Sequence, residues 1–89
     1  MIVTTTPEIT GKTITEYKGL VFGEATEYVW GMSRAHREAV INGRNQAQSQ
    51  LIAHAVQIGA NAIVGVKFDV EYANGIVIVS AAGTAVVMA

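Results

Sequence analysis

The first long pattern in the chain is an alternation of side chains with a period of two, which runs from Thr13 to Glu24 and predicts a β-strand. A Thr-rich arm precedes this strand and contains Pro7. Because proline cannot donate a hydrogen bond to a neighbouring strand, the arm is expected to form at most a short edge strand. Gly19 and Gly23 within the alternation indicate bends or a close approach of another backbone.

A helical period of about 3.6 residues replaces the alternation after Ser33, which can cap a helix starting at the next position. Asn42-Gly43 tolerates left-handed backbone angles, so we expect a short helix over residues 34–41 and a second over residues 44–58. Gly59 is expected to end the second helix. The second helix carries an apolar stripe that is expected to pack on the sheet, formed by Ala47, Leu51, Ile52, Ala55, Val56 and Ile58.

The opposite face of the second predicted helix carries uncharged polar side chains at spacings of four, four and three residues, namely Gln46, Gln50, His54 and Gln57. A helix face in bulk water usually carries lysine and glutamate. This row therefore indicates either burial against another subunit or around a polar channel, or a solvated face of unusual composition.

Asn74-Gly75, between two β-rich runs, predicts a two-residue hairpin, because a type I′ turn needs positive φ at both central positions. Registering the strands on this turn puts Val66 opposite Gly83 and Phe68 opposite Ala81. The predicted core face then collects Val64, Val66, Phe68, Val70, Val77, Val79, Ala81 and Ala85. The second face of the last strand is also apolar, at Ile76, Ile78, Ala82, Val86 and Met88. Both faces need cover, and we expect a helix on one and a neighbouring subunit on the other.

In order, the chain reads as arm, long strand, helices, strand, hairpin and strand, which is a β-α-β-β unit of the α+β class. We expect residues 1–89 to form one domain. Hydrophobic residues make up 51% of the chain and charged residues 15%, against roughly 25% charged in average soluble domains. This deficit of charge indicates surface buried between subunits, unless alanine and glycine merely make the chain look hydrophobic.

Charge and composition exclude several classes of partner and of chemistry. A net charge of -1, with basic residues spread from Lys12 to Lys67, gives no basic stripe, so no nucleic-acid partner is expected. The absence of cysteine excludes disulfides, thiolate metal sites and cysteine-based catalysis. The N-terminus lacks the basic start and apolar run of a secretory signal, so a cytoplasmic location is expected. The apolar tail over residues 76–89 is shorter than the ~20 residues of a membrane-spanning helix, so no membrane is expected.

The chain contains, in this order, Thr5-Thr6-Pro7, Gly23-Glu24-Ala25, Asn42-Gly43-Arg44, Gly59-Ala60-Asn61-Ala62-Ile63-Val64-Gly65-Val66, Asp69 and Gly83-Thr84-Ala85-Val86. Together these segments resemble the YbjQ-like family, whose members are labelled heavy-metal-binding proteins, and the resemblance covers essentially the whole chain. It implies a dodecin-like β-α-β-β subunit that closes into a ring, generally a homopentamer, with extra short strands joining the subunits. Two features depart from the family. The segment between Arg44 and Gly59 is shorter than in longer members, and glutamines replace acidic and basic helix residues.

Four residues are candidates for holding a ligand or ion: Glu24, His54, Asp69 and Glu71. His36 and His54 lack the HxxxH and HExxH spacings, so no zinc or copper site is expected within one subunit. Copies of His54 around a ring axis could gather into a site, and a surface or interface histidine is the alternative. Asp69 and Glu71 alternate on one strand face and could hold a hard cation through oxygens. Charge balance with Lys67 or with a neighbour explains them equally well.

Glu24 ends the predicted first strand and could bind a ligand or pair with an arginine such as Arg44. Phe22, Tyr28 and Trp30 cluster around the strand-to-helix connection, where the tryptophan could anchor the helix or close a small apolar pocket. No serine has a positioned base and no phosphate loop is present, so the sequence predicts no enzyme and no cofactor. The leading interpretation is a non-enzymatic, ring-forming protein that binds or stores a small ligand or ion between subunits. The alternative is a structural or scaffolding homo-oligomer acting through protein partners.

Overall fold

Within the residues that the structure describes, one helix crosses one face of a four-stranded sheet. The computed structural model describes residues 1–29 and 33–89, with side chains from residue 36 onward in the second range. The elements are β1 (Ile2–Val3), β2 (Ile14–Tyr28), α1 (Ser33–Gln57), β3 (Ala62–Ala73) and β4 (Ile76–Met88). The predicted α+β class is confirmed, and the arm contributes the short strand β1.

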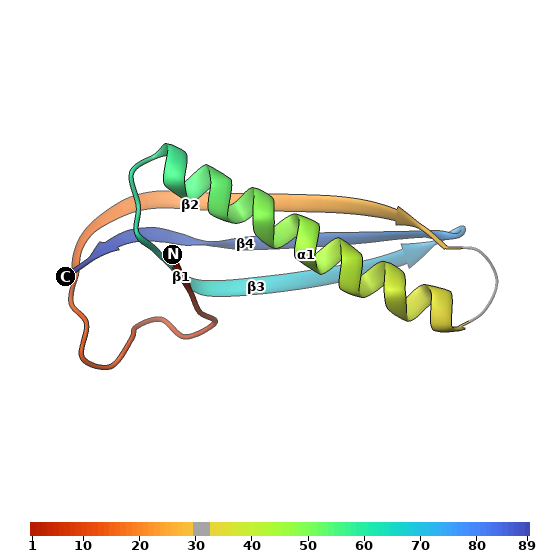
Figure 1. Cartoon of the computed structure of the whole chain (residues 1–89), viewed down its shortest axis with the longest axis horizontal. Helices are drawn as coiled ribbons and strands as arrows, with labels where there is room; N and C mark the ends of the chain where they lie inside the picture. The colour runs from red at the N-terminus through yellow and green to blue at the C-terminus, as the bar shows by residue number, and fades with distance from the viewer. Residues whose placement is uncertain (30–32) are drawn as a thin grey trace.

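The strand order in the sheet is β1-β3-β4-β2. Both β2 and β3 are antiparallel to β4, whereas β1 pairs in parallel with the start of β3. β2 therefore forms one edge of the sheet, and the part of β3 beyond β1 forms the other. Figure 1 shows α1 running diagonally across the sheet, with the β3–β4 turn at one end and both chain termini at the other. These ends are called the hairpin end and the terminal end below.

The turn between β3 and β4 has the predicted geometry, because Asn74-Gly75 has φ values of 52° and 76°. From this turn the register runs as predicted to Phe68, which lies opposite Ala81. The register then shifts between Val64 and Lys67.

A bulge at Gly65 causes this shift and changes which side chains share a face. Gly65 has a φ of 61°, a left-handed angle that glycine adopts without strain. Val66 remains beside Gly83 as predicted, since its Cγ2 lies 3.0 Å from the position of a Cβ at residue 83. Before the bulge the faces exchange, so that Ile63 belongs to the core under α1 and Val64 to the opposite face. The assignment of Val64 to the main core is therefore wrong.

At the terminal end, the face opposite α1 is covered by the chain's own arm. A second buried cluster on that face consists of Ala62, Val64, Val86 and Met88, with Ile9 and Ile14 packed against it. We expected a neighbouring subunit over this whole face of β4. Because the arm covers the terminal end, a neighbouring subunit is now expected only over the hairpin end, where Ile76 and Ile78 are half-buried.

α1 is one continuous helix, so the predicted interruption at Asn42-Gly43 is wrong. Gly43 is buried, and a Cβ on it would lie 2.6 Å from Cγ2 of Val79. It therefore allows α1 to pack closely on β4 instead of ending the helix. The helix does end before Gly59 as predicted, and the φ of this glycine is 83°. The predicted cap at Ser33 involves a side chain outside the described residues.

The main core lies between α1 and the sheet. Three residues of the predicted stripe are fully buried: Ala47, Leu51 and Ala55. β2 continues to Tyr28, beyond the predicted end at Glu24. Gly23 lies directly under the helix, since a Cβ there would be 2.9 Å from the carbonyl carbon of Ala47, and this confirms the predicted close approach of a backbone. Among the described residues, no helix is long and apolar enough to cross a membrane.

Candidate functional site

No element among the described residues covers the sheet face opposite α1 at the hairpin end, and we call this surface the open face. It consists of Leu20, Phe22, Glu24, Thr26 and Tyr28 of β2, Lys67, Asp69 and Glu71 of β3, and Ile76, Ile78, Ser80 and Ala82 of β4. Leu20, Phe22 and Tyr28 are 66%, 59% and 68% exposed. Together with Ile76, which lies opposite Tyr28, and with Ile78, they are the apolar side chains of a face that also carries charged and polar residues. The predicted two-sided apolarity of the last strand corresponds to this surface.

Three predicted ligand residues share the open face, and all three are exposed: Glu24, Asp69 and Glu71. Glu24 and Asp69 lie in one row on either side of Ser80, and Glu71 lies in the next row, opposite Ile78. Because β4 separates the two outer strands, the backbones of Glu24 and Asp69 are about 10 Å apart. In the described part of the chain, no group of three histidine, aspartate or glutamate side chains is close enough to hold a metal ion.

The fourth predicted ligand residue, His54, lies away from the open face, where α1 passes the edge of β2. Its Nδ1 lies 3.4 Å from the backbone nitrogen of Phe22 and accepts that N–H. Gln50, one helical turn earlier, accepts the N–H of Glu24 on its Oε1 at 3.0 Å. Both N–H groups point away from β4, so these side chains cap the outer edge of the sheet.

The spacing of the polar row explains how one helix face can cap a strand edge. Four residues of helix rise about 6 Å, and two residues of strand about 6.6–6.8 Å. Side chains at i and i+4 on a helix can therefore meet successive outward N–H groups of a strand beside it. This role of the row was not predicted, although its spacing is a signal that could have suggested it.

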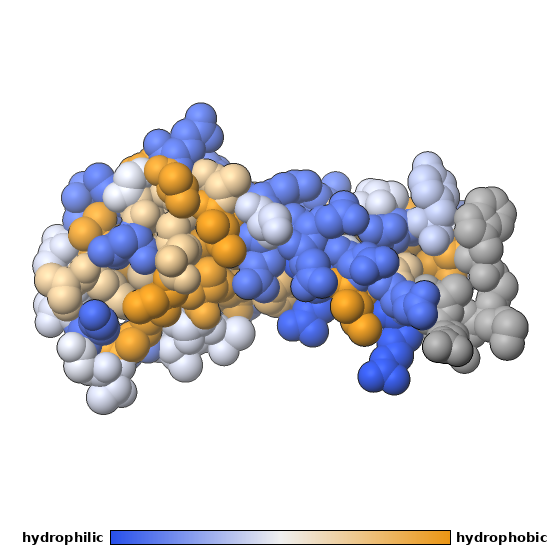
Figure 2. Space-filling view, in the orientation of Figure 1, coloured by the Kyte–Doolittle hydropathy of each residue, from blue (hydrophilic) through white to orange (hydrophobic). Residues whose placement is uncertain are grey.

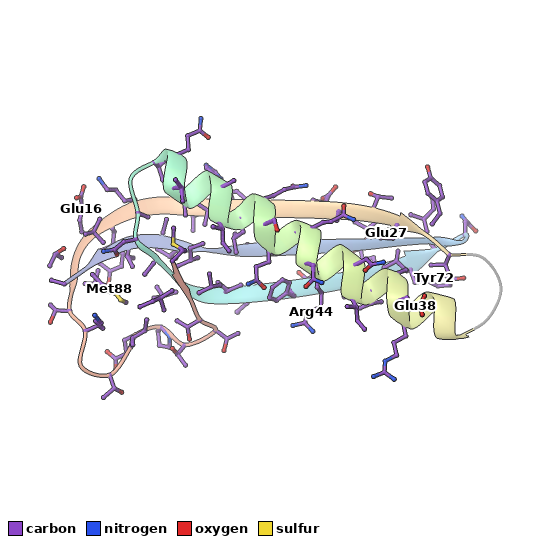
Figure 3. The ribbon with its side chains drawn as sticks, viewed as in Figure 1. Glu16, Glu27, Glu38, Arg44, Tyr72 and Met88 are labelled. Atoms are coloured by element: carbon purple, nitrogen blue, oxygen red, sulfur yellow. The ribbon has the colours of Figure 1, made fainter. Side chains whose placement is uncertain are left out.

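The next member of the row breaks this pattern. Gln46 donates from its Nε2 to the Glu27 carboxylate at 2.6 Å, so it caps no backbone group of β2. Figure 3 places Glu27 on β2 near the hairpin end, where α1 crosses towards β3. Capping of the β2 edge therefore ends at Glu24 in the described residues.

The helix side of β3 holds aromatic contacts and a shallow hollow. The Arg44 guanidinium lies 5.0 Å from the centre of the Phe68 ring, and His36 meets Tyr72 edge-on at 4.8 Å between ring centroids. Arg44 also lines a hollow of about 180 Å³ with neighbours on the same helix. Of the described residues, only members of α1 line it, so these residues do not supply the convergent donors from several elements that ligand sites use. Because Arg44 lies on the helix side, the predicted pair with Glu24 is wrong.

Two other expectations about side chains stay predictions. Lys67 forms no direct ion pair with Asp69 or Glu71, and the ion pair found within residues 1–29 and 33–89 joins Lys18 to Glu16 at 3.0 Å, so charge balance with Lys67 or with a neighbour is untested. Phe22 and Tyr28 are exposed. The role predicted for Trp30 lies outside the described residues.

A smaller apolar surface lies on the helix side at the terminal end. Figure 2 shows hydrophobic residues gathered there, whereas the middle of this side is hydrophilic. Val56, Ile2 and Met1 are exposed, with Val56 at 60%. The protein therefore presents apolar surface on both sides of the sheet, at opposite ends.

Comparisons with known proteins agree with one another. The model of the YbjQ family, whose description reads "Putative heavy-metal-binding", matches residues 1–89. A UPF0145 protein of Clostridium botulinum (strain Eklund 17B / Type B) is 42% identical over 103 residues, which cover 97% of each chain. A UPF0145 protein of Listeria welshimeri serovar 6b is 40% identical over 105 residues, covering 99% of this chain and 96% of the relative. Neither name states an enzymatic activity.

A solved structure shares the fold. It is a protein of unknown function of the DUF74 family from Pediococcus pentosaceus, with a TM-score of 0.80, 21% identity, and coverage of 100% of this chain and 98% of the other. The alignments with the two UPF0145 proteins are longer than the 89 residues of this chain. They therefore contain gaps where the relatives have residues that this chain lacks.

The donor groups do not fit a soft heavy metal within one chain. Cysteine is absent, and the two histidines are separated by about 27 Å along α1, at 1.5 Å per residue. His36 contacts Tyr72, and His54 accepts the N–H of Phe22. The carboxylates of the open face are oxygen donors, which hard cations prefer.

Proposed function

Because this chain belongs to the YbjQ family, we propose that it is a non-enzymatic protein that assembles into a ring of identical copies and binds a small ligand or an ion between them. Five copies are proposed, as the family resemblance implies. The observation that carries the proposal is the open face, where apolar side chains and carboxylates share a surface without a covering element in the described residues.

The apolar part of the open face supports assembly. Leu20, Phe22 and Tyr28 are each more than half exposed. Tyr28 lies opposite Ile76, and Phe22 lies opposite Ala82. Exposed apolar side chains gathered on one uncovered face mark interaction sites in soluble proteins. The low content of charged residues, 15% of the chain, supports the same proposal.

The carboxylates support a site between copies. Glu24 and Asp69 are too far apart in one chain to coordinate the same ion, and a hard cation takes six or more oxygen ligands. A neighbouring copy whose Asp69 lies diagonally across from Glu24, one two-residue step along the strands, would add an oxygen ligand to such a set. Soft metals are disfavoured by the donor groups present, so the proposed ion is calcium-like or manganese-like.

Binding of Mn²⁺ and Ca²⁺ to the dialysed assembly, measured by calorimetry, tests the proposal. We expect Asp69→Asn and Glu24→Gln each to weaken cation binding, because each removes a charged oxygen ligand. Glu8→Gln, on the exposed arm, is the matched control and should bind as the parent does. Binding that survives both open-face substitutions would contradict a cation site on this surface.

A scaffold without a ligand is the second candidate function. It is favoured by the absence, within the described residues, of any three metal-binding side chains close together. Native mass spectrometry of freshly purified protein separates the two functions. Small-molecule or ion mass retained in proportion to the ring supports ligand binding, and a ring without retained mass supports the scaffold.

A further inference from the structure

The outer edge of β2 is capped by its own helix only part of the way. Phe22 and Glu24 direct their N–H groups away from β4 and donate them to side chains of α1. Because backbone groups alternate in direction along a strand, Thr26 and Tyr28 point the same way. Their N–H groups find no partner within residues 1–29 and 33–89, since Gln46 bonds elsewhere. The β2 edge is therefore free from Thr26 to Tyr28.

The outer edge of β3 is occupied only at its beginning. Gly65 and Val66 donate their N–H groups to threonine carbonyls of the arm. By the same alternation, the backbone groups of Phe68, Val70 and Tyr72 point outward beyond the arm. No residue that the structure describes pairs with them.

Both free stretches lie at the hairpin end, on opposite edges of the sheet (Figure 1). β2 and β3 run in the same direction, because each is antiparallel to β4. We propose that β3 of one copy pairs in parallel with β2 of the next copy, through residues 67–73 and 24–28. This inference rests on the ring proposed above and names the strands that join its copies.

Parallel pairing keeps every helix on the same side of the joined sheet. The outward-pointing residues of β2 have side chains on the open face, whereas those of β3 have side chains on the helix side. In a parallel ladder an outward-pointing residue lies opposite an inward-pointing one of its neighbour. Open-face residues then adjoin open-face residues across the contact. Antiparallel pairing of the same two edges would place successive helices on alternate sides, which does not suit a ring of equivalent copies.

Charge selects one register for this contact. Glu24 shares a row with Asp69, so joining copies without a shift along the strands would place these two carboxylates side by side. A shift by one two-residue step puts Glu24 opposite Lys67 and Thr26 opposite Asp69. Lys67 has no ion pair among the described residues, so its charge is unpaired in the single chain.

The same register agrees with the existing caps. In a parallel ladder, Thr26 would donate its N–H to the carbonyl of Phe68 and accept the N–H of Val70 of the next copy. The ladder would end at Glu24, whose N–H is already capped within its own chain. It would also end at Val66 of the next copy, whose N–H is held by that copy's arm. The two free stretches therefore match in position and extent.

Reversing the charges tests the contact. Glu24→Lys and Lys67→Glu each bring like charges together, and we expect each to weaken association about tenfold. The double variant should restore association. An equimolar mixture of the two single variants should restore association in part, because every contact between unlike variants pairs opposite charges, whereas a ring of five must keep one contact between two copies of the same variant. Sedimentation velocity over a range of protein concentrations measures these effects, and Glu8→Lys on the exposed arm is the control.

A second variant probes the backbone pairing. Val70→Pro removes an outward N–H, and proline is tolerated on an exposed strand edge, so the chain should keep its circular dichroism while association is lost. A ring that withstands this change and both charge reversals would overturn the edge contact while leaving the ring itself in place. A parent protein that sediments as a monomer would overturn the ring. Weakening by Lys67→Glu but not by Glu24→Lys would indicate contact between two β3 edges, and would also overturn the inference.

Discussion

Gln50 tests the capped part of the β2 edge. Its Oε1 accepts the Glu24 N–H at 3.0 Å. Gln50→Leu keeps a side chain of similar size and removes the acceptor. A hydrogen bond of this kind contributes about 0.5–1.5 kcal/mol net, and 1.4 kcal/mol corresponds to about tenfold in an equilibrium constant. The Glu24 N–H is therefore expected to exchange with deuterium about two- to tenfold faster, because local opening of the edge becomes easier.

Hydrogen exchange of the Glu24 amide by NMR, on three variants, separates the cap from other effects. Gln50→Glu keeps an acceptor and should exchange at nearly the parent rate. Gln57→Leu lies in the same polar row without a bond in the described part of the chain, and should leave this amide unchanged. Equal rates for Gln50→Leu and the parent would refute the cap. Dissociation of the assembly in the Gln50→Glu variant would instead indicate that the polar row lies in a contact between copies.

Urea unfolding at fixed protein concentration checks three further substitutions. Gly23→Ala should destabilise the fold by about 2 kcal/mol or more, because the new Cβ meets the helix backbone at Ala47, and a variant as stable as the parent would contradict that close approach. Gly43→Ala should cost less, because it meets a valine methyl group and gains about 1 kcal/mol of helix propensity; a larger loss than that of Gly23→Ala would refute the comparison. Asn61→Ala should cost about 1–3 kcal/mol, because its side chain bonds both the N–H and the C=O of Met88, and an unchanged midpoint would count against that role.

Local residue chemistry predicts the hairpin end of the sheet well. Asn74-Gly75 favours a type I′ turn, and the pairing of Phe68 with Ala81 follows by counting residues along both strands from that turn. The same counting fails beyond Gly65. A glycine inside a strand is compatible with a regular position or a bulge, and the arm that packs at this point lies far away in the sequence.

Tertiary packing decides the features that local patterns predict wrongly. Asn42-Gly43 favours a helix end in isolation, but packing of Ala47 and Leu51 on the sheet holds the helix through it. The polar row was recognised as unusual, yet its partner could not be inferred, because the position of β2 at an edge depends on strand order. The sequence predicts Glu24 and Asp69 as separate ligand residues. Their common row on the open face, on either side of Ser80, depends on the position of β4 between their strands.

The central claim is that copies of this chain join through their two free edges into a closed ring. Thr26→Cys combined with Asp69→Cys tests it directly, because the chain has no cysteine of its own. Within one chain β4 and an offset of two residues along the strands separate these positions by roughly 12 Å, beyond the reach of a disulfide, whereas the proposed contact places them opposite each other. Mild oxidation should give a ladder of linked species in multiples of the 9.4 kDa chain, ending at the ring number, for which five is expected. Recovery of unlinked monomer alone, at micromolar concentration and with both thiols oxidisable, would contradict the claim.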